Sequence, residues 1–163
     1  MTSAQPFTAP IATGLDVLLQ ERCDLLRGKR VGLISNPTGV TRELRSNVDA
    51  LREAGVNLAA LFGPEHGFSA SAADGAAVES GRDARTGLPV YSLYGNIRKP
   101  TREMLANLDV LLFDLQDVGA RFYTFTTTLA LALEACAENH LPLIVLDRPN
   151  PINGIMIEGP VLD

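Results

Sequence analysis

The sequence has few of the residues that bind metals or form disulfides. It contains two cysteines, Cys23 and Cys136, and two histidines, and it has no Cys-X-X-Cys pair. Both cysteines stand among apolar residues in segments with helical spacing, which favours two reduced, partly buried thiols over a disulfide. A structural zinc ion usually takes four cysteine or histidine ligands, so we expect no metal site.

Long apolar runs and clusters of basic residues are also missing. No run approaches the roughly 20 residues that cross a membrane, and residues 1–12 have neither the basic nor the apolar part of a signal peptide. As written, the sequence predicts a cytoplasmic protein without a membrane span. An incomplete N-terminus would instead allow a periplasmic or secreted one. The 14 Lys and Arg residues are scattered and the net charge is −5, so nucleic acid is not an expected partner.

Signature loops for nucleotides and for common nucleophiles are absent as well. The first expected strand is not followed by GxGxxG, and the sequence has neither a GxxxxGK[ST] phosphate loop nor a GxSxG nucleophile elbow. We therefore expect no cofactor.

The alternation of apolar patterns predicts the fold. Strands are expected over residues 31–35, 58–62, 89–94, 109–115 and 143–146, and helices over residues 14–27, 41–55, 101–108 and 122–139. Several strands are apolar on both faces, which is typical of a parallel sheet covered by helices on each side. We predict a Rossmann-like, doubly wound α/β domain with a mostly parallel sheet over residues 14–163, after a flexible leader over residues 1–13.

Capping residues and apolar spacing predict where the helices begin. Thr41 is expected to cap the helix over residues 41–55, with Leu44 on its buried side. Phe122 is expected to begin the buried stripe of the helix over residues 122–139.

Polar segments rich in glycine or proline directly follow four of the expected strands. They are residues 36–39, 63–67, 116–119 and 147–151. The carboxyl ends of parallel strands share one edge of a sheet, and ligands bind in the crevice outside that edge. We therefore expect the four segments to form one site, although they are far apart in the sequence.

Glu65 is the candidate for a catalytic acid. It stands between Pro64 and His66 in a short loop that is bounded by glycines. A carboxyl group held at a strand end and partly removed from water suits general acid catalysis. The alternative is a solvated carboxylate in a turn, or one that caps a helix. His66 could bind a sugar hydroxyl or orient Glu65, or it could be an ordinary loop histidine.

Two more carboxylates follow the most apolar strand. Asp114 and Asp117 bracket Gln116. Paired carboxylates suit the cleavage of glycosidic bonds, in which one protonates the leaving oxygen and the other assists water or the forming cation. The alternative is that one of the two caps the helix that follows.

Arg121, Tyr123 and Thr124 come next, at the expected start of a helix. Amides at a helix N-terminus attract anions, and an arginine beside them adds a two-pronged donor. This place suits a carboxylate on a substrate. The alternative is an ion pair between Arg121 and one of the aspartates, and both roles can coexist.

Further side chains in these segments are candidates for substrate binding. They are Asn36, Gln116, Arg148 and Asn150. Their amide and guanidinium groups supply hydrogen-bond donors at the same expected edge.

Long motifs in these segments resemble the exo-β-N-acetylmuramidase family of bacterial cell-wall hydrolases. They occupy residues 28–40, 61–67, 87–95, 113–124, 147–154 and 158–160. The resemblance extends over about residues 14–163. It implies a Rossmann-like domain joined to a C-terminal domain that this sequence lacks, with the active site in the cleft between them.

The same resemblance implies an activity in cell-wall turnover and recycling. The expected reaction releases N-acetylmuramic acid from the non-reducing ends of peptidoglycan fragments, with Glu65 as the acid/base. The lactyl carboxylate of that sugar is our candidate ligand for Arg121. The alternatives are a non-catalytic sugar-binding module, a truncated inactive fragment, or another α/β enzyme that acts on a small anionic ligand. The sequence gives no oligomeric state.

Overall fold

The computed structural model describes residues 11–65, 67–69, 81–152, 155 and 159. Its strands are β1 (Val31–Ser35), β2 (Leu58–Gly63), β3 (Gly81–Arg82), β4 (Pro89–Ser92), β5 (Val110–Asp114) and β6 (Leu143–Val145). Its helices are α1 (Gly14–Glu21), α2 (Asn47–Glu53), α3 (Arg102–Leu105) and α4 (Phe125–Glu138), with a short 3-10 helix η1 (Cys23–Leu26).

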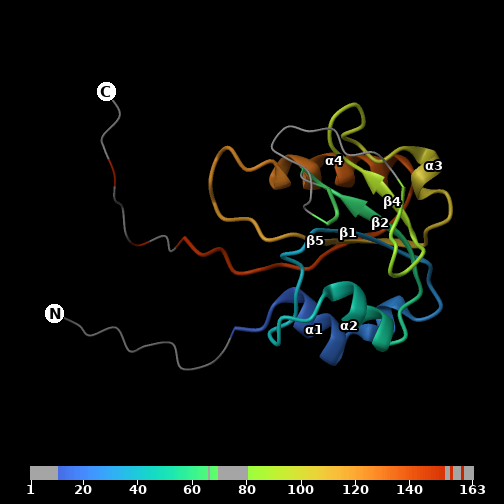
Figure 1. Cartoon of the computed structure of the whole chain (residues 1–163), viewed down its shortest axis with the longest axis horizontal. Helices are drawn as coiled ribbons and strands as arrows, with labels where there is room; N and C mark the ends of the chain where they lie inside the picture. Colours follow the sequence, from blue (N-terminus) through green and yellow to red (C-terminus); the bar gives the residue numbers. More distant parts are fainter. Residues whose placement is uncertain (1–10, 66, 70–80, 153–154, 156–158, 160–163) are drawn as a thin grey trace.

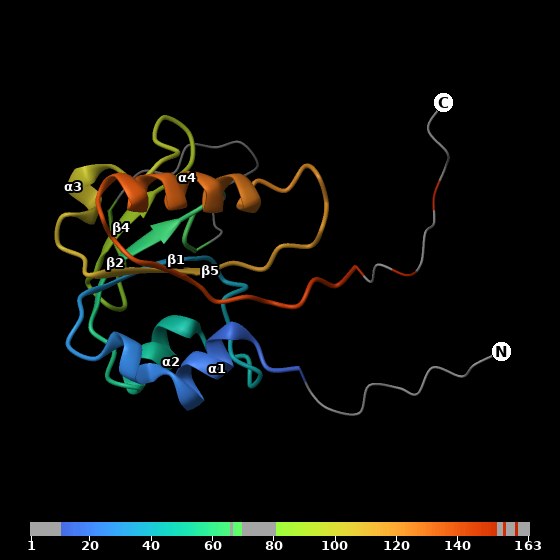
Figure 2. The same cartoon turned by 180° about the vertical axis from the view of Figure 1, so that it is seen from behind.

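The six strands form one sheet in the order β3-β4-β2-β1-β5-β6. Neighbouring strands are parallel throughout, except that β3 pairs antiparallel with β4 at one edge. Helices α1 and α2 cover one face of the sheet, and α3 and α4 cover the other (Figures 1 and 2). The prediction of an α/β fold with a mostly parallel sheet between two helical layers is confirmed.

Apolar strands explain why helices cover both faces. Every residue of β1 and β5 is buried. Within β1, Leu33 packs with α1 and α2, whereas Ile34 packs in the core that contains α4. Full burial of one such side chain contributes roughly 1.5–3 kcal/mol. Both faces of the central strands must therefore be covered, which a pair of helical layers achieves.

The register of the strands brings the expected functional segments to one edge. Ser35 at the end of β1 pairs with Asp114 at the end of β5, and the ends of β2 and β6 lie beside these two strands. We call the segments that follow the strands at this edge the rim. It comprises residues 36–40, 64–65, 67–69, 115–124 and 146–152.

Two predicted helix starts were wrong. Helix α2 begins at Asn47 and not near Thr41, and Leu44 is 80% exposed with a left-handed φ of 59°. The backbone amide of Asn47 donates to the carbonyl of Gly39, and its side chain is held in a buried network described below. These contacts place the helix start, so a local capping pattern could not reveal it.

The second wrong start concerns Phe122. Helix α4 begins at Phe125, and Phe122 is 83% exposed in the turn before it. The first helix is also shorter than expected, because α1 ends at Glu21 and the chain continues as η1. The short helix after Thr101 does start where the sequence indicates, since Thr101 accepts a hydrogen bond from the amide of Met104 at 3.4 Å. Within the described residues the longest helix has 14 residues, and none is long and apolar enough to cross a bilayer.

Both cysteines are free thiols, and they differ in exposure. Cys136 is buried, and this burial raises its pKa to about 11. At pH 8 its reactive thiolate should therefore be populated roughly a few hundredfold less than that of a free cysteine with a pKa of about 8.5. We expect iodoacetamide to modify the half-buried Cys23 first, as measured by mass spectrometry over time. In urea both should react alike, and equal native rates would contradict the prediction.

Candidate active site

Glu65 lies on the rim in a tight turn after β2. Gly67 donates its amide hydrogen to the carbonyl of Pro64 at 2.9 Å and has a left-handed φ of 77°. A Cβ atom on Gly63 would collide with the backbone nitrogen of Phe68, so the chain folds back closely here. This geometry holds the half-buried Glu65 at the sheet edge. His66 lies outside the described residues.

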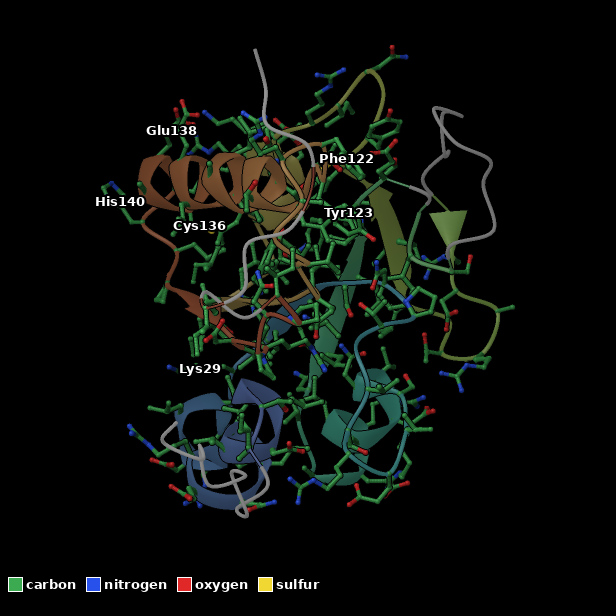
Figure 3. All side chains as sticks on the ribbon, turned by 90° about the vertical axis from the view of Figure 1, so that its left-hand side faces the viewer. Lys29, Phe122, Tyr123, Cys136, Glu138 and His140 are labelled. Atoms are coloured by element: carbon green, nitrogen blue, oxygen red, sulfur yellow. The ribbon has the colours of Figure 1, made fainter. Side chains whose placement is uncertain are left out.

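A hydrogen bond joins Glu65 to the start of α4. The Thr124 hydroxyl donates to Oε2 of Glu65 at 3.0 Å, across 59 residues of sequence. Arg121 is three residues before Thr124, so Glu65 lies on the same rim as the 116–124 segment. Figure 3 views the molecule from the side on which this segment projects in Figure 1, and Phe122 and Tyr123 are labelled there.

Asp114 lies beneath the rim and is fully buried. Arg148 donates to both of its carboxylate oxygens, from Nε to Oδ1 at 2.6 Å and from Nη2 to Oδ2 at 3.0 Å. Asn47 donates to Oδ2 at 2.7 Å. With both oxygens occupied and no exposed surface, Asp114 acts as a structural group and faces no substrate. Its arginine partner is only 5% exposed, so Arg148 has the same structural role.

The Asp114–Arg148 pair connects several strand ends. Nη2 of Arg148 also donates to the carbonyl of Val40 at 3.0 Å. The Asn47 amide donates to Ser35, whose hydroxyl donates to the carbonyl of Asp114 at 3.0 Å. Within the described part of the chain, every buried polar side-chain atom has a partner. Satisfied buried networks of this kind hold one arrangement of the chain.

Gln116 and Asn36 also hold the rim together. The Gln116 amide donates to the carbonyls of Asp117 and Pro149, at 2.7 and 3.0 Å. Asn36 accepts hydrogen bonds from the hydroxyl and the backbone amide of Thr38. Both were candidates for substrate binding, and the structure shows that their side chains hydrogen-bond within or between rim segments.

Asp117 and Asn150 lie in turns of the rim. Oδ1 of Asp117 accepts from the amide of Gly119 at 2.7 Å, and Oδ1 of Asn150 accepts from the amide of Ile152 at 2.9 Å. Neither aspartate caps α4, because the residue at its N-cap is Thr124. Asp117 is half-buried, so it is a carboxylate that remains at the surface of the rim.

Arg121 projects from the turn before α4. It is exposed, and no ion pair engages it within the described residues. The sequence allowed an ion pair between Arg121 and Asp114, but in the structure Asp114 pairs with Arg148 instead. Three aromatic residues follow Arg121 in the chain. The ring of Tyr123 packs edge-on against the ring of Phe125, with ring centroids 5.2 Å apart, and the ring centroid of Phe122 lies 6.0 Å from that of Tyr123. The positive charge of Arg121 is thus available to a ligand.

Sequence reasoning did not connect Thr124 with Glu65. A threonine at the start of a helix is ordinarily expected to cap that helix, and nothing local shows a partner 59 residues away. Phe122 was also missed as a rim residue, because its apolar side chain matches the spacing of a buried stripe.

A cavity of about 570 Å³ borders the rim at Leu146, Asp147 and Pro149 and is otherwise lined mainly by residues of α1 and β6. A second, smaller cavity also borders the rim. It has a volume of about 110 Å³ and is lined in part by Asp117, Phe125 and Arg148, below the roughly 300–1,000 Å³ of common ligand pockets. Another cavity, about 860 Å³, lies by Lys99 and His140, away from the rim. The candidate site is therefore defined by the side chains that meet on the rim, and not by cavity volume. Among the described residues no three His, Cys, Asp or Glu side chains form a metal-binding group.

Comparison with known proteins identifies the family. The family model described as exo-β-N-acetylmuramidase NamZ, N-terminal, matches residues 31–163. The chain belongs to this family. The resemblance seen in its motifs is thereby confirmed.

Relatives of known sequence or structure agree with this membership. The peptidoglycan β-N-acetylmuramidase NamZ of Bacillus subtilis is 55% identical over 154 residues, which are 94% of this chain and 37% of the relative. A crystal structure of a DUF1343 family protein from Bacteroides fragilis matches with 54% identity and a TM-score of 0.80, covering 93% of this chain and 38% of that one. A second from the same species has 35% identity and a TM-score of 0.74, covering 95% and 39%. The chain thus spans less than two fifths of the length of these relatives.

The buried ion pair predicts a contrast between two arginines. Arg148→Met leaves the Asp114 carboxylate buried without its cation, so we expect the free energy of unfolding to fall by about 3–5 kcal/mol. The matched change Arg121→Met removes an exposed charge that has no ion pair among the described residues, and it should alter the free energy of unfolding by less than about 0.5 kcal/mol. Urea denaturation measures both. Equal losses in the two variants would contradict the structural role of Arg148.

Proposed function

We propose that this chain supplies the acid/base group of an exo-β-N-acetylmuramidase, which releases N-acetylmuramic acid from the non-reducing ends of peptidoglycan fragments. The observation that carries the proposal is the half-buried Glu65 carboxylate, held on the rim by the Thr124 hydroxyl at 3.0 Å. The relative that is 55% identical is named for an activity of this kind. Contacts to more of the saccharide would come from the sequence that the longer relatives have outside the matched region.

Cleavage of a glycosidic bond requires a proton on the leaving oxygen. Glu65 would donate it as the bond to the anomeric carbon breaks, and would then take a proton from the water that adds to that carbon. One group thus serves as acid and then as base.

A second group must support the positive charge that forms on the sugar. Asp114 is unsuitable, because its two oxygens are held by Arg148 and Asn47 in a buried site. Asp117 is half-buried on the rim, and one of its oxygens is engaged in a turn. We therefore assign the second role to Asp117, or to the acetamido group of the substrate itself.

The substrate carries a carboxylate on its lactyl group, and Arg121 is our candidate partner for it. Arg121 is exposed beside the N-terminus of α4, where no side chain caps the helix. Free amides and a guanidinium group together favour an anion. This arrangement would distinguish N-acetylmuramic acid from N-acetylglucosamine, which has no such carboxylate.

Glu65→Gln tests the catalytic assignment. The amide cannot give up a proton, so we expect turnover of an aryl β-N-acetylmuraminide to fall by about 10²- to 10⁴-fold. Affinity for N-acetylmuramic acid should persist, because Gln has the shape of Glu. Released aryl alcohol measures the rate, and calorimetric titration measures binding. A wild-type protein that binds the sugar without any turnover would instead be a sugar-binding module.

Arg121→Met tests the carboxylate assignment. Loss of a hydrogen bond to a charged group costs about 1.5–3 kcal/mol, so kcat/KM for the aryl muraminide should fall roughly ten- to hundredfold. Cleavage of the matching aryl β-N-acetylglucosaminide, however slow, should stay as it was, because it has no lactyl group. If kcat/KM falls equally for both substrates, Arg121 does not bind the lactyl carboxylate.

A further inference from the structure

The hydroxyl of Thr124 has a partner that its position in the helix does not explain. Thr124 is the N-cap residue of α4, yet its side chain makes no capping hydrogen bond. It donates to Oε2 of Glu65 at 3.0 Å instead. A capping side chain is worth about 0.5–2 kcal/mol over alanine, so α4 lacks a stabilising contact that a threonine at this position commonly provides.

Other threonines in this chain show the common behaviour. Thr13 caps α1 by accepting a hydrogen bond from the amide of Asp16 at 3.2 Å. Thr101 caps α3 in the same way. Among the three threonines at helix N-caps, Thr124 is thus the one whose hydroxyl is directed to another segment; the N-cap of α2, Ser46, also makes no side-chain cap hydrogen bond.

Both ends of the hydrogen bond are held by backbone contacts. The Thr124 carbonyl accepts from the amide and the hydroxyl of Thr128, at 2.9 and 3.2 Å. The turn before it is closed by the Tyr123 amide, which donates to the carbonyl of Ala120 at 3.0 Å. Glu65 is in the tight turn after β2. Glu65 lies two residues after the end of β2 and Thr124 directly precedes α4, so both side chains lie close to the ends of these elements.

We propose that Thr124 is a positioning residue for Glu65, and that it determines which carboxylate oxygen carries the proton. With Oε2 accepting from Thr124, the proton resides on Oε1, which has no hydrogen-bond partner among the described residues. This proposal rests on the proposed function. The proton passes from Oε1 to the leaving oxygen while the glycosidic bond breaks, and Oε1 takes a proton back from the attacking water.

The kinetic test compares three variants of the protein that turns over the aryl β-N-acetylmuraminide. Thr124→Val keeps the shape and removes the hydroxyl, so kcat should fall roughly two- to tenfold with KM unchanged. Thr124→Ser keeps the hydroxyl and should restore kcat. The control is Thr127→Val, the same change one residue before Thr128, at an exposed position whose hydroxyl has no hydrogen bond within the described residues; it should match the wild type.

A crystal structure of each variant supplies a readout that does not depend on turnover. The Glu65 carboxylate should leave its place in Thr124→Val and keep it in Thr124→Ser. Thr124→Ala serves the same purpose if the valine variant does not fold. An unmoved carboxylate, an unchanged kcat, or a serine variant as slow as the valine variant would overturn the proposal. A wild type without any turnover would defeat the proposed function, while the crystal structures would still decide the position of Glu65.

Discussion

A buried ion pair between Asp114 and Arg148 is the contact on which the rim depends. Two charges removed from water cost several kcal/mol each, and only a close, fully hydrogen-bonded partner offsets that cost. Here the partners come from the end of β5, the segment after β6, the start of α2 and the segment after β1. The pair is therefore satisfied only when these segments meet, and its formation draws the strand ends into one arrangement.

This constraint divides the polar residues of the rim into two groups. Asp114 and Arg148 form an ion pair below the surface, and the side chains of Asn36 and Gln116 hydrogen-bond to rim segments. Glu65, Asp117 and Arg121 remain at the surface, where a ligand can reach them. The buried and hydrogen-bonded residues hold the surface residues in fixed positions. This matters because reacting groups must be placed within a fraction of an ångström to be effective.

Local patterns predicted where a helix begins when its cap was local. Thr13 and Thr101 begin α1 and α3 by bonding to amides three residues on. The predicted starts of α2 and α4 were wrong. At α2 the side chain of Asn47 donates to Asp114, 67 residues away, and at α4 the hydroxyl of Thr124 donates to Glu65, 59 residues away. The N-cap side chain accepts a hydrogen bond from the helix in α1 and α3 and makes no capping hydrogen bond in α2 and α4. The domain boundaries, the compartment and the role of His66 stay predictions from the sequence.

The sequence by itself determined the parallel sheet, because strands that are apolar on both faces must be covered on both. It also determined that four polar segments share an edge, since parallel strands all end on the same side. Only the tertiary structure decided which carboxylate is buried beside an arginine and which stands on the rim with a threonine. The sequence offers both Asp114 and Asp117 as catalytic carboxylates, and their different roles arise from neighbours that the folded chain brings within hydrogen-bond distance.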